Sequence, residues 1–188
     1  MSDPLSDDQG RVLLTLARTP LQHRLVGGDA PQAPDDPTLL SSAATFVTLK
    51  KAGNLRGCIG NLQPVGALWE GIRDNAINAA FHDGRFSPLR AEELLRVHLD
   101  ISILSSPQPL AYTDPETLVA KLRPGIDGVI VGDGRHSATF LPQVWQQLPD
   151  PQQFLGHLCL KAGLAERAWR DRKLEIQTYQ VQCFAEDK

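Results

Sequence analysis

The run of residues 55–60 contains the side chain with the clearest capacity for chemistry, the thiol of Cys58. Gly57 and Gly60 flank this thiol, and glycines let a backbone approach a ligand closely. Arg56 stands two positions before it, and a helix is expected shortly after the run. A cation and a helix N-terminus both stabilise a thiolate or bind an anion. Cys58 is therefore a candidate nucleophile, and its three neighbours form a candidate binding site for a small anionic ligand.

A structural role explains the same residues equally well. Cys58 can be a small buried residue of a core strand, with glycines required for packing. Alternation along a strand places Arg56 and Cys58 on one face. The opposite face then carries Leu55, Gly57 and Ile59. An arginine beside the thiol argues against a wholly apolar environment, and we expect this arginine to be exposed and its removal to leave the fold intact.

A cysteine nucleophile usually needs a neighbouring base. The five histidines, at positions 23, 82, 98, 136 and 157, are each explained as ordinary surface or half-buried side chains. We therefore assign no base. The missing base weakens the hypothesis of a cysteine enzyme and leaves open whether the protein is an enzyme at all.

Two further residues are candidate ligand-binding groups. Arg85 follows the longest helical pattern and could pair with a ligand carboxylate or phosphate, although capping the end of that helix is the better explanation. Asp127 lies between Gly125 and Gly128 in a glycine-rich turn. Aspartates in turns often accept hydrogen bonds from their own backbone, so a structural role is again the simpler interpretation.

Composition and motifs argue against several classes of protein. Neither a CxxC pair nor an HExxH pair is present, so we expect no metal and no cofactor. The net charge of −3 does not favour binding to nucleic acid, and no apolar stretch approaches the length of a membrane span. The acidic, polar N-terminus does not resemble a secretory signal, so we expect a cytoplasmic protein.

The length of 188 residues predicts one domain over residues 1–188, with a helix and a polar loop in residues 1–40. A capping box of Ser6 and Gln9 begins the helix, which should bend or stop near Pro20. A β-hairpin is expected over residues 46–59, and a helix over residues 64–82 with Val65 on its apolar face.

The rest of the chain interleaves strands with helices. Strands are expected at residues 97–103, 129–131, 137–141 and 176–184, and helices after Asp114 and Asp150. Several of these strands are joined by short turns. That arrangement favours an α+β fold with a mixed or antiparallel sheet over a doubly wound parallel one.

The run Leu55-Arg56-Gly57-Cys58-Ile59-Gly60 resembles the hexapeptide that marks the AMMECR family, whose prokaryotic members are also called AmmeMemoRadiSam system protein A. Other segments resemble the same family in collinear order over most of the chain. They are Phe46-Val47-Thr48-Leu49, Arg85-Phe86 with Pro88, Asp100-Ile101-Ser102-Ile103-Leu104, Gly125 with Asp127-Gly128, Leu141-Pro142-Gln143-Val144, Cys159-Leu160-Lys161-Ala162-Gly163-Leu164, and Gln180 with Gln182 and Phe184. Any one segment is a weak signal, but the set is specific.

The resemblance implies a single AMMECR-type domain with flanking helices, in which two related halves contribute to a barrel-like sheet. It also implies association with a radical SAM protein and a Memo-like protein, but no particular reaction. Three hypotheses follow: an accessory or ligand-binding module working with those partners, a cysteine-dependent enzyme centred on Cys58 and Arg56, and a protein-interaction scaffold.

Overall fold

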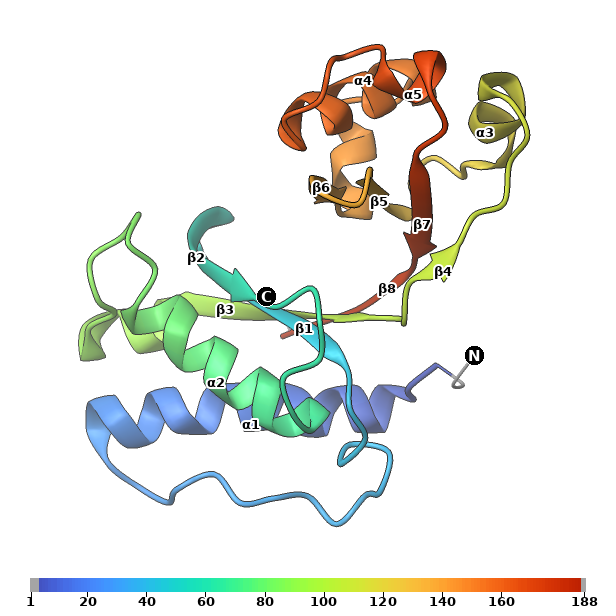
Figure 1. The fold of residues 1–188 in the computed structure, drawn as a ribbon. Coiled ribbons are helices and arrows are strands. Elements are labelled where there is room, and N and C mark those ends of the chain that lie inside the picture. The colour runs from blue at the N-terminus through green and yellow to red at the C-terminus, as the bar shows by residue number, and fades with distance from the viewer. Residues whose placement is uncertain (1–3, 187–188) are drawn as a thin grey trace. The chain divides into compact units, whose positions relative to one another are not determined.

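A computed structural model describes residues 4–186 and divides them into two units (Figure 1). Unit 1 comprises residues 4–104 and 182–186, and unit 2 comprises residues 105–181. Each unit has its own hydrophobic core and its own four-stranded antiparallel sheet. The α+β class with antiparallel sheets is thereby confirmed.

Unit 1 is built from seven elements. They are α1 (Asp7–Val26), β1 (Ala44–Lys51), β2 (Asn54–Gly60), α2 (Leu68–Phe81), the 3-10 helix η1 (Ala91–Arg96), β3 (Val97–Leu104) and β8 (Val181–Ala185). The strand order is β2-β1-β3-β8. Fully buried Val47, Leu49, Leu99 and Ile101 pack against apolar residues of α1 and α2, so both helices cover one face of this sheet.

The predicted hairpin is confirmed as β1 and β2, which pair antiparallel. Ala52 and Gly53 form its turn with φ angles of 50° and 79°. Two consecutive positive φ values are typical of the two-residue turns that match strand twist. The register shifts once within the hairpin: Lys50 pairs with Leu55, but Leu49 pairs with Gly57. The residue left between those pairs, Arg56, is therefore the extra residue of a β-bulge.

The first helix is longer than the sequence predicts. The capping box of Ser6 and Gln9 is confirmed, with hydrogen bonds in both directions. However, α1 does not stop at Pro20 and continues to Val26. Pro20 is itself buried and Leu21 beyond it is fully buried, so packing offsets the hydrogen bond that proline cannot donate.

The second helix is shorter at its start than the sequence predicts. α2 begins at Leu68 rather than at residue 64, because residues 66 and 67 run alongside the segment before β1. The backbone N–H of Leu68 donates to the carbonyl of Ser41 at 2.7 Å. Val65 is 75% exposed, so its predicted place on the apolar face of the helix was wrong.

Unit 2 contains the remaining elements. They are β4 (Gln108–Pro109), α3 (Pro115–Lys121), β5 (Gly128–Gly132), β6 (Ser137–Phe140), the 3-10 helix η2 (Pro142–Gln146), α4 (Pro151–Lys161), α5 (Ala168–Asp171) and β7 (Glu175–Tyr179). The strand order is β4-β7-β5-β6. Trp145 stacks on Phe154 at 3.7 Å between ring centroids in its core.

The predicted strand over residues 176–184 is two strands. β7 pairs with β5 in unit 2, whereas β8 pairs with β3 in unit 1, and the chain crosses between the units near Gln180. Within residues 4–186 each sheet is open, with β2 and β8 at the edges of one and β4 and β6 at the edges of the other. The expected barrel-like sheet is therefore only a loose description, because no strand pairing among these residues closes either sheet.

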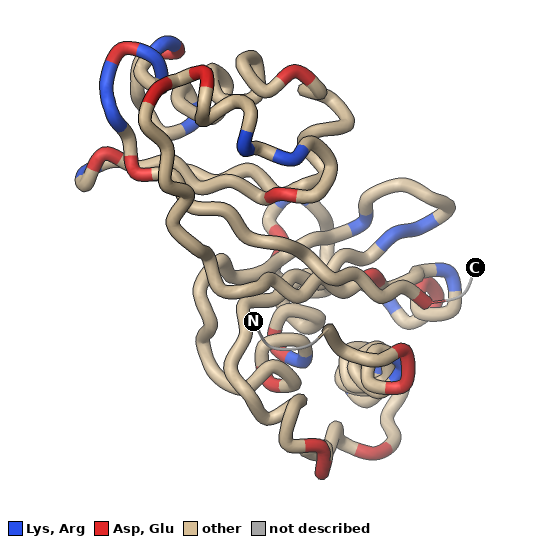
Figure 2. Tube along the Cα trace, turned by 90° about the vertical axis from the view of Figure 1, so that its right-hand side faces the viewer, with Lys and Arg blue, Asp and Glu red and all other residues tan. Residues whose placement is uncertain are grey.

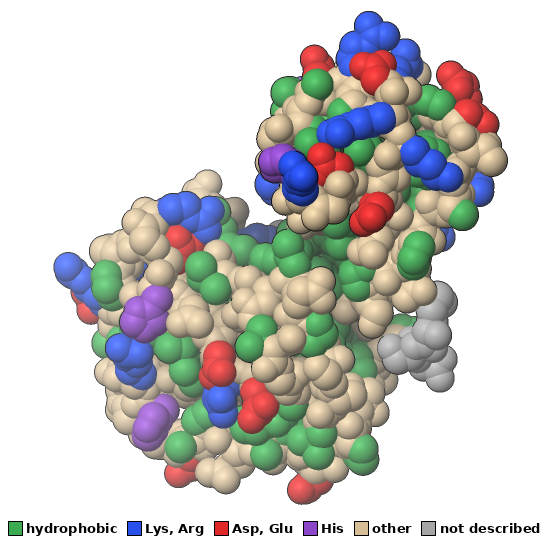
Figure 3. Space-filling model, viewed as in Figure 1, with side chains coloured by type: hydrophobic (Ala, Val, Ile, Leu, Met, Phe, Trp, Pro, Cys, Tyr) green, Lys and Arg blue, Asp and Glu red, His purple; other side chains and the backbone are tan. Residues whose placement is uncertain are grey.

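Charged residues of both signs are interspersed along the trace (Figure 2) and are scattered over the face shown in Figure 3. Among residues 4–186, no helix combines the length and the apolar character needed to cross a bilayer.

Candidate functional site

Cys58 lies on the face of the unit 1 sheet opposite α1 and α2, here called the helix-free face. It pairs with Thr48 of β1, which in turn pairs with Asp100 of β3, so the three residues form a row across three strands. The hydroxyl Oγ1 of Thr48 donates to Sγ of Cys58 at 3.2 Å. The thiol is half-buried, and its immediate neighbour is a hydroxyl rather than a base.

The backbone of Cys58 is held by an ion pair from the loop after α2. Its N–H donates to Oδ2 of Asp83 at 2.9 Å, and its carbonyl accepts from Nη2 of Arg85 at 3.2 Å. Since β2 is an edge strand, these groups point away from the sheet. The pair of Asp83 and Arg85 therefore satisfies backbone groups that a further strand would otherwise bond.

Asp83 is the anchor of this arrangement. Its side chain is 4% exposed and accepts two bonds from the guanidinium of Arg85, at 2.9 and 2.7 Å. Hydrogen bonding to Arg85, followed by the backbone N–H groups of Cys58 and Arg85, holds the pKa of Asp83 well below its usual range despite the opposing effect of burial. Asp83 therefore stays ionised and keeps Arg85 in one orientation.

Arg85 combines this fixed position with exposure to solvent. Its side chain is 58% exposed. Hydrogen bonding to Asp83 raises its pKa. Its Nη2 also donates to the backbone carbonyl of Cys58, so the guanidinium lies beside β2 at this residue. The prediction that Arg85 caps the end of α2 was wrong, since its side chain bonds to Asp83 and to the carbonyl of Cys58.

The side chain of Arg56 bonds to Glu93 and Ser87 rather than to Cys58. It donates to both carboxylate oxygens of Glu93, at 3.2 and 2.9 Å, and to the carbonyl of Ser87 at 2.9 Å. Lys51 also contacts Glu93, at 2.7 Å. Bonds from Arg56 and then Lys51 lower the pKa of Glu93 to about 2. The side chain of Arg56 is 11% exposed, so the expectation of an exposed arginine was wrong.

The bulge at Arg56 also changes which residues share a face. Residues paired across two strands point to the same side, so Leu55 lies on the face of Lys50, while Gly57 lies on the face of Leu49. Simple alternation placed Leu55 and Gly57 together, which was wrong because it ignored the extra residue.

Both glycines of the hexapeptide are required by packing. A Cβ at Gly57 would lie 2.1 Å from the carbonyl oxygen of Ala79 in α2. A Cβ at Gly60 would lie 2.2 Å from the ring of Phe46. The space beside each glycine is thus filled by the protein itself, which accounts for both residues without a ligand.

Asp127 belongs to unit 2 and takes part in its own turn. Its carboxylate accepts a hydrogen bond from the backbone N–H of Arg123 at 3.0 Å. It also forms an ion pair with the guanidinium of Arg123 at 2.6 Å. Its carbonyl accepts Nε1 of buried Trp145 at 2.7 Å. These bonds give Asp127 a structural role in unit 2, whereas Arg56, Gly57, Cys58, Gly60 and Arg85 come together in unit 1.

Sequence reasoning missed Thr48, Asp83 and Glu93, the residues that hold the others in place. Asp83 stands two positions before Arg85, a spacing that can signal a local ion pair in a loop. Glu93 lies 37 positions from Arg56, and only the tertiary fold brings them together. Within residues 4–186, no three His, Cys, Asp or Glu side chains gather in a way that could hold a metal ion.

The site therefore offers a half-buried thiol, a hydroxyl bonded to it, and one fixed cation open to solvent. A guanidinium held by a carboxylate on one side can bind a carboxylate or phosphate on another. The arrangement suits recognition of an anion beside the thiol more directly than proton abstraction from it.

Comparison with known proteins identifies the family. The AMMECR1 family model matches residues 14–184, and the chain belongs to that family. A protein of Methanothermobacter thermautotrophicus is 38% identical over 98% of this chain and 97% of its own length. Protein NEQ441 of Nanoarchaeum equitans is 37% identical over 93% of this chain and 99% of its own. The crystal structure of the uncharacterized protein PH0010 from Pyrococcus horikoshii is similar with a TM-score of 0.82 and 31% identity, over 97% of this chain and 94% of that one.

Proposed function

We propose that the protein is an accessory binding module that works with a radical SAM protein and a Memo-like protein, and that its binding site surrounds Cys58. The exposed guanidinium of Arg85, which buried Asp83 holds against the backbone carbonyl of Cys58, is the observation that carries the proposal. The ligand is a small anion or an acidic group of a partner. The two partners are suggested by the family resemblance.

The roles within the site follow from these contacts. Arg85 binds the anion, and Cys58 with Thr48 forms the adjoining wall on the helix-free face. Arg56 acts through Glu93, because this ion pair ties β2 to η1 and so supports the loop that carries Arg85. Gly57 and Gly60 allow β2 to pack against α2 and Phe46.

A cysteine-dependent enzyme is the second candidate, favoured by a partly exposed, thiol-bearing strand whose backbone carbonyl at Cys58 is bonded to the cation of Arg85. Against it, the hydrogen bond at Sγ comes from the hydroxyl of Thr48, which does not act as a base at neutral pH. A scaffold without any small-molecule site is the third candidate. It requires no fixed, exposed cation at this position.

The deciding experiment is co-purification of the full chain from its native host, with mass spectrometry of bound proteins and small molecules. Arg85→Ala and Arg85→Lys are compared with Arg135→Ala, which removes the same charge from an exposed turn of unit 2. We expect both Arg85 variants to lose the bound partner or ligand. Alanine removes the cation, and lysine cannot reproduce the planar guanidinium that bonds to Asp83 through two nitrogens. Thermal melting of each variant separates lost binding from lost folding.

Cys58→Ser distinguishes the binding module from the cysteine-dependent enzyme. A binding module should keep its partners when the thiol becomes a hydroxyl of similar size, whereas a nucleophile should lose function in a complementation assay. If folded Arg85→Lys retains every partner and ligand bound by the unaltered protein, the proposed site is wrong.

A further inference from the structure

The two edges of the unit 1 sheet differ in how they are protected. Edge strands of native sheets usually carry devices that prevent further pairing, such as bulges, charges or prolines. At β2, the bulge at Arg56 and the ion pair of Asp83 and Arg85, which bonds the backbone of Cys58, act in this way. β8 at the other edge has the sequence Val-Gln-Cys-Phe-Ala, without a charge, a proline or a glycine.

The backbone of β8 is directed so that it can accept another strand. Within residues 4–186, β8 pairs on one side only, with β3. The N–H of Glu186 donates to the carbonyl of Leu99 in β3 at 3.0 Å. Because backbone groups alternate in direction along a strand, those of Cys183 and Ala185 face the free edge.

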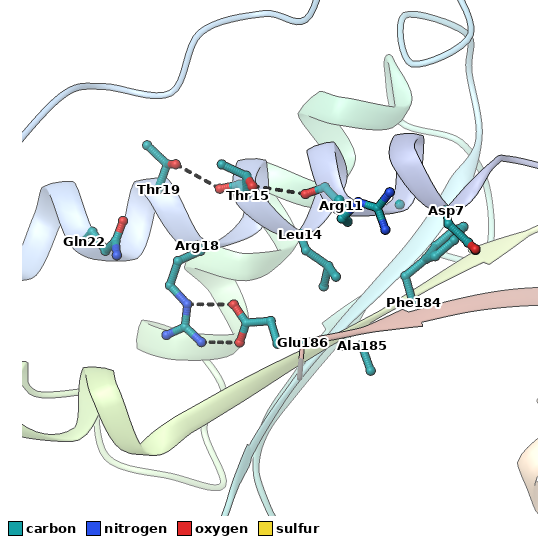
Figure 4. A pocket seen from close by; sticks show the side chains of 11 residues that line it. Asp7, Arg11, Leu14, Thr15, Arg18, Thr19, Gln22, Phe184, Ala185 and Glu186 are labelled. Atoms are coloured by element: carbon teal, nitrogen blue, oxygen red, sulfur yellow. Dashed lines mark hydrogen bonds and ion pairs between the residues drawn. The ribbon is translucent and has the colours of Figure 1, made fainter. Parts of the chain in front are cut away.

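A groove runs beside this edge, between β8 and α1 (Figure 4). Its volume is about 610 Å³. The residues used here to define the α1–β8 groove are Arg11, Leu14, Thr15 and Gln22 of α1 with Phe184 and Ala185 of β8. Leu14 points from α1 toward β8. A free strand edge flanked by a helix is the arrangement in which extended peptides add to a sheet.

The two arginines of the groove are already paired within the chain, and Asp7, which also lines it, carries the remaining charge. Arg11 forms an ion pair with Asp8, and Arg18 forms a two-pronged ion pair with Glu186. A charged ligand would therefore have to compete with these pairs. An uncharged segment needs no such exchange and can place apolar side chains against Leu14.

A second copy of the chain fits this edge less well. If two β8 strands paired about a two-fold axis, the two α1 helices would lie beside each other. The stripe of α1 at the groove carries exposed Arg11, Thr15 and Gln22, and stable dimer interfaces are more apolar than this. An isolated peptide brings no helix, so these side chains stay hydrated.

We propose that β8 and the α1–β8 groove bind an uncharged, extended segment of another protein, of roughly five residues, by strand addition. Hydrogen bonds from Cys183 and Ala185 hold its backbone, and alternate apolar side chains contact Leu14. This site lies at the edge of the sheet opposite to β2 and does not depend on the function proposed for Cys58.

The test begins with selection of phage-displayed random heptapeptides on the immobilised full chain. Enriched peptides are synthesised and their affinities are measured by fluorescence polarisation at low and high salt. Backbone N-methylation at one set of alternate positions should weaken binding at least about tenfold, and methylation at the other set should leave it within about twofold. Affinity should change little with salt, because both arginines of the groove are already paired and the bound segment carries no charge.

Matched variants locate the binding site. Thr15→Arg fills the α1–β8 groove and should weaken binding at least about tenfold. Val12→Arg places the same side chain on an exposed position of α1 that does not line the groove, and should leave the affinity unchanged. Failure to enrich any peptide, loss of the alternating pattern, or equal effects of the two variants would overturn the proposal. So would a dimer in sedimentation that only Thr15→Arg dissociates, because a second copy would then occupy the edge.

Discussion

Arg56 and Arg85 lie near the same aromatic ring but differ in their exposure to solvent. The guanidinium carbons are 6.0 and 5.5 Å from the ring centroid of Phe86. Arg56 is 11% exposed and Arg85 is 58% exposed. The two cations therefore differ in role: Arg56 is largely buried and ties β2 to η1, whereas Arg85 is exposed to solvent.

Arg56→Ala should destabilise the fold by about 1–3 kcal/mol, because it removes three hydrogen bonds and leaves Glu93 half-buried with Lys51 as its cation. Urea denaturation of the variant measures this change. Arg96→Ala, at an exposed position of η1, serves as the control and should change stability by less than about 0.5 kcal/mol. Equal stability of Arg56→Ala and the unaltered protein would contradict the role assigned to the ion pair.

The lowered pKa of Glu93 makes stability depend on pH. The ordinary value is 4.5 and the folded value is about 2. Ionised Glu93 therefore stabilises the folded protein above about pH 4.5, and this contribution is lost as the pH falls through about 2. In urea melts between pH 7 and pH 2, Glu93→Gln should begin less stable and decline less steeply. The decline that persists in Glu93→Gln includes the contribution of Asp83, whose pKa is also lowered. Parallel declines would show that Glu93 does not titrate as expected.

At the scale of elements, β2 is fitted closely to α2 through Gly57. Gly57→Ala would force a Cβ to within 2.1 Å of a backbone carbonyl that cannot move independently, so we expect a loss of about 1–3 kcal/mol or more. Gly84→Ala is the matched control, since a Cβ there would meet no atom within 4 Å. Thermal melting should show a large decrease for the first variant and almost none for the second. The reverse order would mean that β2 does not pack on α2 as described.

Local patterns predicted the hairpin of β1 and β2, because its signals lie within a few residues: β-formers on both sides of Ala52-Gly53. The same patterns could not reveal the bulge at Arg56, since an extra residue changes no local propensity. Likewise, the continuous strand pattern of residues 176–184 contains no signal that Gln180 separates two sheets. Cys58 and Arg85 could be named as candidates from the sequence, but the contacts of Asp83 with Cys58 and of Glu93 with Arg56 depend on the tertiary fold.

At the scale of the whole molecule, unit 2 is inserted between two neighbouring strands of unit 1. β3 ends at Leu104 and β8 begins at Val181, and the two strands are paired. At the base of unit 2, the N–H of Ser105 donates to the carbonyl of Gln180 at 2.9 Å, so its two ends lie together. Insertion at such a point leaves the host sheet intact.

Replacing residues 105–180 by an Asn-Gly turn should therefore convert β3 and β8 into a hairpin and leave unit 1 folded. The excised segment 105–181 contains its own core and should also fold. Circular dichroism and amide dispersion in NMR spectra measure both outcomes. If neither piece folds while the full chain unfolds in one transition, the single domain predicted over residues 1–188 is the better description.

The insertion also sets an order for the emerging chain during translation. All strands of unit 2 are complete once Tyr179 has been synthesised, but the sheet of unit 1 lacks β8 until Ala185 follows. The ion pair between Arg18 and Glu186 also cannot form until Glu186, 168 positions later, has been synthesised. On the ribosome, the inserted unit can thus complete its core first, while the sheet of unit 1 stays incomplete until β8 has been synthesised.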